Sequence, residues 1–168
     1  MGKRSSFPRR QNDEYATPLS AVLPLLPHLN ARARYYEPCV GRGDLVGHLD
    51  KHGLRLVGAS DLEKDARVTQ YFFADFECFI TNPPWTREIL HPIINNLRIQ
   101  APTWLLFDAD WMHTRQAAPY LRCCSKIVSV GRVKWIPDSP FVGKDNACWY
   151  LFENRETHTN FIGRDVQD

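Results

Sequence analysis

Long hydrophobic runs are missing from this sequence of 168 residues. Its longest early apolar stretch, residues 21–26, is interrupted by Pro24 and is far shorter than the ~20 residues that a membrane span needs. No apolar segment of the signal-peptide kind follows the basic start of the chain. We therefore expect a cytoplasmic protein without membrane contact.

Cysteine patterns and a charge excess are also missing. The five cysteines show neither C-x2-C spacing nor a Cys/His ligand pattern, so the sequence supports neither a disulfide scaffold nor a metal site. The 21 basic and 19 acidic residues leave a net charge of +2, which is too balanced to indicate nucleic-acid binding by itself. With 43% hydrophobic residues and no internal repeat, the chain should form one domain around a real core.

The start of the chain differs from the rest in composition. Four basic residues crowd its first ten positions, with no acidic residue among them. We expect residues 1–13 to be a disordered basic tail and residues 14–168 to be the folded domain. The tail is either a solvated terminus or an arm that binds nucleic-acid phosphates.

Strand-like and helix-like segments alternate along residues 14–168, which predicts a mainly parallel sheet covered by helices on both faces. Only the ten residues 137–146 join the last two strands, too few for a crossover helix, so these strands should form an antiparallel hairpin. The expected fold is α/β and doubly wound, with a seven-stranded, mostly parallel sheet that ends in this hairpin. The expected strands cover residues 34–37, 54–59, 71–73, 78–81, 103–107, 126–136 and 148–153. The expected helices cover residues 44–52, 62–68, 87–99 and 117–121, and one more starts at Thr17-Pro18 and is shortened by Pro24.

A glycine-containing turn follows the first expected strand. Glu37, Gly41 and Gly43 stand in the order acid-Pro-x-x-Gly-x-Gly, and the glycines permit a tight turn and the close approach of a ligand. The dinucleotide pattern G-x-G-x-x-G is not present, because Val46 stands where its last glycine would be. A hydride-transfer enzyme is therefore disfavoured. The turn suits a less anionic nucleoside ligand, or it joins a strand to a helix without any ligand.

Two further acidic positions lie near the ends of expected strands. Asp61 closes the second strand, where a carboxylate commonly binds ribose hydroxyls, although it can equally cap the next helix. Asp75 and Phe76 precede the fourth strand; such a pair can bond to the edge of a base and stack on its face, but it is also ordinary in loops. Both positions are candidates for nucleoside contacts.

The most specific feature is Asn82-Pro83-Pro84-Trp85, directly after a buried expected strand. A residue before proline is held extended, and two prolines fix two successive φ angles, so Asn82 should project from a stiff corner. Ligands of open α/β sheets bind at the carboxyl ends of the strands, where this corner would lie. The corner is therefore the main candidate for a functional site.

Taken together, these motifs resemble those of class I S-adenosylmethionine-dependent methyltransferases of the N6-adenine type, which have a Rossmann-like fold. The resemblance covers residues 15–85, in the family's order and roughly its spacing. It implies that the glycine turn wraps the amino-acid end of the cofactor, that Asp61 binds its ribose, and that Asp75 and Phe76 bind its adenine. The cofactor site implied by the resemblance consists of Tyr15, Thr17, Glu37, Pro38, Gly41, Gly43, Asp61, Asp75, Phe76 and Asn82.

The resemblance also implies that Asn82, Pro83, Pro84 and Trp85 form a catalytic corner that holds the target amine. The Asn82 side-chain oxygen and the Pro83 carbonyl can each accept an N–H bond, and Trp85 can stack on a flipped-out base. No metal or general base is required. Trp85 stands where Tyr or Phe is more common in the family, and the chain leaves no room for a separate target-recognition domain, so a separate partner could supply recognition.

Basic residues mark a candidate substrate surface. Arg132 and Lys134 share one side of an expected strand by alternation, and Lys144 lies in the loop that follows. Arg87 comes shortly after the catalytic corner. These residues either bind the phosphates that flank a target base or belong to an ordinary solvated hairpin.

The sequence thus predicts a monomeric, single-domain enzyme that transfers a methyl group from S-adenosylmethionine to the N6 amine of adenine in DNA. The same corner could act on adenine in RNA or on a protein glutamine amide, which presents a similar planar amine. A catalytically silent nucleoside- or DNA-binding module is disfavoured by the intact Asn82 corner.

Overall fold

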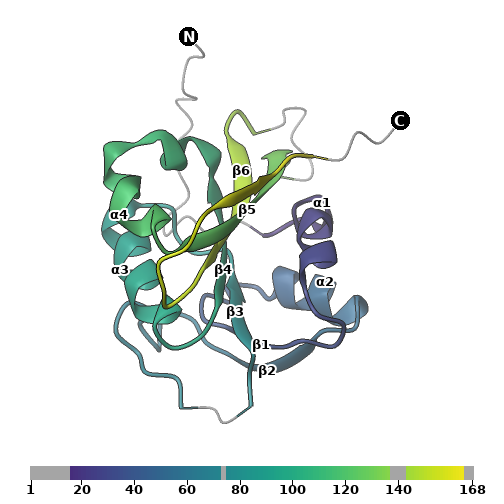
Figure 1. Ribbon diagram of the computed structural model, residues 1–168. Helices are drawn as coiled ribbons and strands as arrows, with labels where there is room; N and C mark the ends of the chain where they lie inside the picture. Colours follow the sequence, from purple (N-terminus) through teal and green to yellow (C-terminus); the bar gives the residue numbers. More distant parts are fainter. Residues whose placement is uncertain (1–15, 73–74, 137–142, 165–168) are drawn as a thin grey trace.

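The computed structural model describes residues 16–72, 75–136 and 143–164. Within these residues the chain forms a seven-stranded sheet in the order β2-β1-β3-β4-β6-β5-β7, with helices on both faces (Figure 1). The expected α/β fold, with a mostly parallel sheet and an antiparallel hairpin, is confirmed. The expected basic tail lies outside the described residues. No helix of the described ranges is long and apolar enough to cross a membrane.

The first four strands form the parallel half of the sheet. They are β1 (Arg34–Glu37), β2 (Arg55–Ala59), β3 (Cys78–Thr81) and β4 (Thr103–Asp108). β1 lies between β2 and β3, and β3 pairs with β4, all in parallel. The carboxyl ends of these strands therefore meet at one end of the sheet, which we call its carboxyl end.

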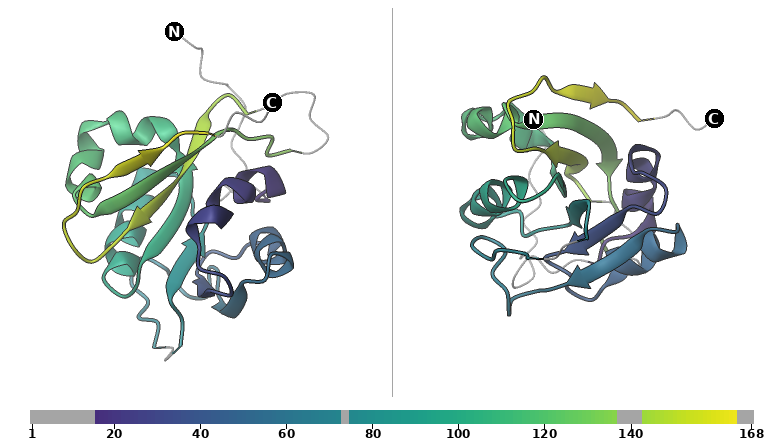
Figure 2. Two further views of the ribbon diagram at one scale, coloured as in Figure 1. Left: turned by 45° about the vertical axis from the view of Figure 1, so that its right-hand side comes forward. Right: turned by 60° about the horizontal axis from the view of Figure 1, so that its bottom comes forward.

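The other half contains β5 (Cys124–Arg132), β6 (Asn146–Phe152) and the short β7 (Asn160–Ile162). β6 runs antiparallel to both β4 and β5, and β7 pairs with β5 in parallel. β5 therefore points the same way as β4, and its last residue, Arg132, lies at the carboxyl end of the sheet. Figure 2 shows β2 and β7 at opposite edges of the twisted sheet.

One group of helices covers each face (Figure 1). The first face carries α1 (Leu19–Val22), the 3-10 helix η2 (Leu23–His28) and α2 (Asp44–Lys51). The second face carries α3 (Arg87–Arg98), the 3-10 helices η3 (Ala109–His113) and η4 (Arg115–Ala117), and α4 (Ala118–Leu121). α1 gives way to a 3-10 helix at the turn that contains Pro24, as the sequence predicts.

Side chains of the buried strands alternate between two hydrophobic clusters, one under each group of helices. On β4, Trp104 and Leu106 pack toward α1 and α2, whereas Leu105 and Phe107 pack toward α3 and η3. This alternation follows from the period of a strand, in which successive side chains point to opposite faces. The central strands are therefore buried on both faces and form a rigid support for the loops at their ends.

Two expected elements between β2 and β3 are wrong. Residues 62–68 form turns rather than a helix, and neither Tyr71 nor Phe72 belongs to a strand. Among the described residues no strand pairs with the outer side of β2, so β2 is an edge strand whose side chains are largely exposed. The sheet still has the expected number of seven strands, because β7, which the sequence did not predict, pairs at the opposite edge.

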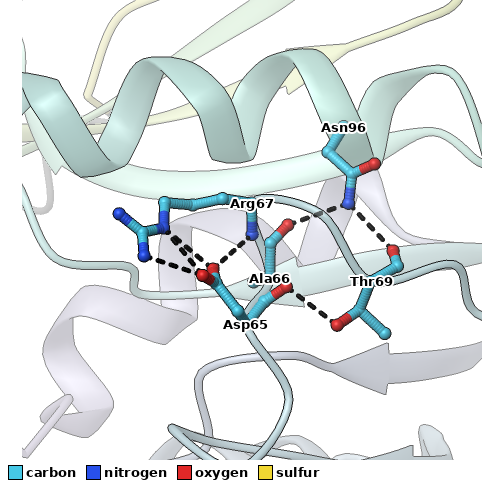
Figure 3. A network of polar contacts seen from close by, with 5 residues as sticks. All are labelled: Asp65, Ala66, Arg67, Thr69 and Asn96. Carbon is cyan, nitrogen blue, oxygen red and sulfur yellow. Dashed lines mark hydrogen bonds and ion pairs between the residues drawn. The ribbon is translucent and has the colours of Figure 1, made fainter.

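The segment 61–72, which we call the wall loop, is held by residues at the end of α3 (Figure 3). The Asn96 side-chain amide donates to the carbonyl oxygens of Ala66, at 3.0 Å, and Thr69, at 2.9 Å. Gln100 accepts a backbone N–H of the same segment at 2.8 Å. Because buried backbone groups need partners, these two side chains replace the hydrogen bonds that a regular element would have supplied.

Candidate functional site

A cleft of about 320 Å³ opens at the carboxyl ends of β1, β2 and β3. Its sides come from the turn after β1, the wall loop after β2, the Asn82 corner after β3, and Ile89 and Ile93 of α3. Open α/β sheets bind their ligands at this end of the strands. The sequence-predicted residues that line the cleft are Thr17, Glu37, Pro38, Gly41, Asp61, Asn82 and Pro84.

The turn between β1 and α2 has the backbone that its glycines allow. Gly41 and Gly43 have φ angles of 48° and 81°, in the left-handed region that favours glycine. A Cβ atom at either position would meet no described atom within 4 Å, so the backbone angle rather than a lack of space requires glycine. Gly41 lines the cleft, whereas Gly43 caps α2 outside it.

Glu37 ends β1 and lines the cleft with only 1% of its surface exposed. Its Oε1 accepts the backbone N–H of Cys39 at 3.2 Å, whereas Oε2 has no hydrogen-bond partner among the described residues. Burial raises the pKa of Glu37 well above its ordinary value, although the nearby Thr81 hydroxyl and the Cys39 N–H act in the opposite direction. A buried carboxyl oxygen without a partner costs stability, so this group is suited to a donor brought by a ligand.

The Asn82 corner joins the predicted catalytic residues to the predicted cofactor residues. Asn82 Nδ2 donates to Thr17 Oγ1 at 3.1 Å, which connects the segment before α1 to the end of β3. Asn82 Oδ1 accepts the indole N–H of Trp85, also at 3.1 Å. Pro83 is buried and Pro84 lines the cleft, so the corner is held by packing as well as by its restricted φ angles.

Trp85 packs against both hydrophobic clusters and against Trp135, which follows β5. The centroids of the two ring systems are 5.5 Å apart and their planes meet at 82°, an edge-to-face contact. Trp135 belongs to the basic segment that the sequence marks as a substrate surface. Sequence reasoning did not connect the two tryptophans, because they follow strands that β4 and β6 separate in the sheet, and they meet where both pack against the hydrophobic cluster under α1 and α2.

The wall loop contributes charged side chains to the cleft. Asp61 lines it, as predicted, and its backbone N–H donates to Glu63 Oε1 at 3.0 Å. Asp65 and Arg67 also line it and form an ion pair with a shortest distance of 2.7 Å (Figure 3). The Arg67 hydrogen bonds lower the pKa of Asp65. Sequence reasoning missed this pair because it placed both residues in a helix.

Asp75 and Phe76 do not lie at the cleft, which corrects their predicted role in adenine binding. Asp75 is 77% exposed at its side chain and pairs with Arg34 at 3.4 Å, where β1 begins. Phe76 packs against Tyr36 and Phe79, with ring centroids 6.2 and 4.8 Å apart. The physical reason is that Tyr71 and Phe72 belong to no strand and Asp75 leads into β3 at its amino end, opposite the carboxyl end where ligands bind.

The structure brings the four predicted substrate-surface cations to the carboxyl end of the sheet. Arg132 ends β5, Lys134 follows it, and Lys144 lies two residues before β6 begins. Arg87 begins α3 directly after the Asn82 corner, and its guanidinium donates to Gln116 at 2.8 Å. Arg132, Lys134 and Lys144 are exposed. Phosphate binding by these residues stays a prediction. The predicted cofactor residue Tyr15 lies outside the described residues.

Solved structures of methyltransferases have the same fold. A type I restriction-modification methyltransferase subunit from Streptococcus thermophilus matches with a TM-score of 0.57 and 10% identity, over 89% of this chain and 47% of that one. The modification subunit of a putative type I restriction enzyme from Vibrio vulnificus matches with a TM-score of 0.56 and 12% identity, over 92% and 48%. The 23S rRNA methyltransferase ErmE matches with a TM-score of 0.51 and 13% identity, over 82% and 68%.

The chain spans about half the length of the two restriction-modification subunits. Neither a protein-family model nor a curated protein sequence matches it. At identities this low the similarity concerns the arrangement of the elements rather than the chemistry. The chain therefore has the Rossmann-like α/β fold that these methyltransferases have, with its cleft at the carboxyl end of the sheet.

Proposed function

We propose that this chain binds S-adenosylmethionine in the cleft and transfers its methyl group to the exocyclic N6 amine of adenine in DNA. The observation that carries the proposal is the Asn82 corner, whose side-chain amide borders a cleft that also contains a buried glutamate oxygen without a hydrogen-bond partner in the described part of the chain. The fold similarity to methyltransferase subunits of restriction-modification systems supports methyl transfer as the reaction class.

The residues of the cleft fit this cofactor. Glu37 Oε2 has no hydrogen-bond partner within the described ranges and suits a cationic group, which S-adenosylmethionine has at its amino-acid end. Asp61 offers a carboxylate to ribose hydroxyls, and Ile89 and Ile93 give an apolar wall for a flat purine. The volume of about 320 Å³ lies within the usual range for small-molecule sites. When bound, the cofactor supplies an electrophilic methyl group.

Asn82 acts on the acceptor amine. An exocyclic amine is a weak nucleophile because its lone pair is delocalised into the ring. Hydrogen bonds from the amine to Asn82 Oδ1 and to the Pro83 carbonyl favour a pyramidal nitrogen whose lone pair is free to form the new N–C bond. The methyl–sulfur bond breaks with its electron pair left on sulfur, and the surplus amine proton leaves to water. The stiff corner keeps both acceptors in place, so positioning and fixed dipoles supply the rate.

A base paired in duplex DNA must first leave the stack, which costs a few kcal/mol. The face of Trp85 recovers roughly 1–3 kcal/mol by stacking on the extruded base. Arg132 and Lys134, exposed at the same end of the sheet, are placed for the flanking phosphates. The fold similarity to an rRNA methyltransferase makes adenine in RNA the second candidate acceptor.

The test is transfer of label from tritiated S-adenosylmethionine to DNA, RNA and protein offered separately, followed by identification of the modified group. We expect label in N6-methyladenine from DNA. Asn82→Ala should abolish transfer and leave the calorimetric affinity for the cofactor nearly unchanged. Label found only in RNA or in glutamine would identify that acceptor, rather than DNA, as the substrate. Turnover by the Asn82→Ala variant near that of wild type would refute the mechanism.

The substrate surface has its own test. Reversing both Arg132 and Lys134 to Glu should weaken DNA binding and lower the slope of log affinity against log salt by about one unit for each lost phosphate contact. Filter binding across salt concentrations measures this slope. Superimposable slopes for wild type and the double variant would exclude this surface as the nucleic-acid site.

A further inference from the structure

The side-chain amide of Asn82 is held at both ends. Its Nδ2 donates to Thr17 Oγ1 and its Oδ1 accepts the indole N–H of Trp85, both at 3.1 Å. Thr17 is only 4% exposed, and Trp85 packs against both hydrophobic clusters. The amide therefore lies between two side chains that are themselves fixed by packing.

The two partners differ in their ability to distinguish the two ends of the amide. A carboxamide can turn by half a revolution with little change in shape, which exchanges its oxygen and its NH₂ group. A threonine hydroxyl both donates and accepts, so Thr17 can bond to either end. An indole N–H only donates, so it can face only the oxygen. The contact with Trp85 therefore decides the orientation of the Asn82 amide.

We infer that Trp85 is a positioning residue that acts through Asn82: its indole N–H fixes the amide so that the oxygen is available to the target amine. This inference rests on the proposed function, in which Asn82 Oδ1 accepts an N–H of that amine. A carbonyl oxygen has two lone pairs, so it can accept the indole N–H and an amine N–H at the same time. The reversed amide would present N–H groups to an amine that also donates, and the acceptor would be lost.

The choice of tryptophan at position 85 follows from this role. Phenylalanine has no polar donor, and a tyrosine hydroxyl both donates and accepts, so neither would select the oxygen. The edge-to-face contact with Trp135, with centroids 5.5 Å apart, helps to fix the position of the indole. The ring of Trp85 thus uses its face for a base and its N–H for Asn82.

The test compares Trp85→Phe with wild type in methyl transfer to DNA. Phenylalanine keeps a stacking face and removes the donor. We therefore expect kcat to fall about five- to tenfold, the scale of one lost hydrogen bond, with little change in the KM for DNA or in cofactor affinity. The matched control is Trp111→Phe, which removes an indole N–H that donates to His91 at 3.0 Å in the cluster under α3 and η3, and it should leave kcat close to that of wild type. Benzothienylalanine at position 85 has the shape of tryptophan without the N–H, so it should show the same loss of kcat. It provides the test if Trp85→Phe fails to fold.

An unchanged kcat with benzothienylalanine, or an equal loss in Trp111→Phe, would overturn the inference and leave Trp85 with stacking alone. Hydrogen exchange of the five indole N–H groups, followed by NMR, tests the contact without any turnover. The Trp85 proton should exchange slowly in wild type and rapidly in Asn82→Ala, and equal exchange in both would also overturn the inference. A wild-type chain that labels none of the acceptors would instead refute the proposed function, whatever the exchange result.

Discussion

Replacing Glu37 by Gln should raise the stability of the free protein and weaken its affinity for the cofactor. Glutamine has nearly the same shape and keeps an acceptor for the Cys39 N–H, but it carries no charge. In the wild type, Oε2 is buried and has no hydrogen-bond partner among the residues that the structure describes, and burial raises the pKa of the carboxyl group. An amide NH₂ at that place can donate to the nearby Thr81 hydroxyl and requires no buried charge.

The size of both effects can be worked from this environment. Removal of a poorly solvated carboxyl group and the gain of one hydrogen bond should together stabilise the free protein by about 1–3 kcal/mol. For a chain of this length each kcal/mol shifts Tm by about 2–4 °C, so Tm should rise by roughly 2–12 °C. Cofactor binding loses one charge-assisted hydrogen bond of about 1.5–3 kcal/mol, so the Kd should rise about 10- to 150-fold.

The pH dependence of stability gives a second signature of Glu37. Because the pKa of Glu37 is raised in the folded state, the folded protein keeps a proton that the unfolded chain has released. Stability therefore falls as pH rises from the ordinary value of 4.5 through the folded value. The variant lacks this dependence, so its advantage in Tm should grow with pH across that window. Thermal melts at several pH values and calorimetric titrations with S-adenosylmethionine measure the two effects.

A matched control is Glu77→Gln. Glu77 pairs with Arg34 at 3.6 Å, at the opposite end of the sheet from the cleft. This variant should leave the Kd unchanged and should not raise Tm. A lower Tm for Glu37→Gln would show that the carboxylate stabilises the fold, and an unchanged Kd would remove Glu37 from the cofactor site; either result refutes the reasoning.

Three other predictions address the sides of the cleft and the second hydrophobic cluster. Asp61→Ala should weaken cofactor binding, measured by calorimetry, by about 1–3 kcal/mol, and Asp75→Ala should leave it unchanged. Weaker binding in Asp75→Ala alone would restore the sequence-based assignment of Asp75 to the cofactor site. Asn96→Ala removes the side-chain donor to the Ala66 carbonyl and leaves only Gln100 as side-chain donor to the Thr69 carbonyl, so it should destabilise the protein by about 1–3 kcal/mol and speed amide exchange in the wall loop more than in β5 and β6. Burial lowers the pKa of His91, so the folded state binds fewer protons than the unfolded chain, and Tm should fall as pH drops below the ordinary value of 6.5. His91→Gln should flatten that part of the curve of Tm against pH. An unchanged curve would show that this pH dependence does not come from His91.

Features with local signals were predictable from the sequence. The expected strand at residues 78–81 has the bounds of β3, because four apolar or β-branched residues end at a proline corner that no strand can continue through. Gly41 and Gly43 have the positive φ angles that their spacing in a strand-to-helix turn suggested. The cleft lies beside the Asn82 corner because parallel strands bring their carboxyl ends together whatever the sequence between them.

Features that depend on distant partners were not predictable. The wall loop has the composition of a helix, and its irregular path is decided by Asn96 and Gln100, about thirty residues further along the chain. Asp75 carries the same local pattern whether it leaves one strand or enters the next, and only its ion pair with Arg34 at the start of β1 places it at the amino end of β3. The contact between Trp85 and Trp135 likewise depends on packing against a shared hydrophobic cluster rather than on sequence spacing.

The unpaired outer side of β2 has a consequence for how the protein behaves at high concentration. Within the described ranges no strand takes up the hydrogen bonds on that side, and Leu56 and Val57 are 41% and 37% exposed beside it. A short apolar edge of this kind is a template to which a strand of another molecule can add. On warming, molecules should therefore aggregate first through pairing at β2, before the buried central strands separate. Val57→Lys places a charge on this template, and light scattering during a thermal ramp should then show aggregation starting at a higher temperature.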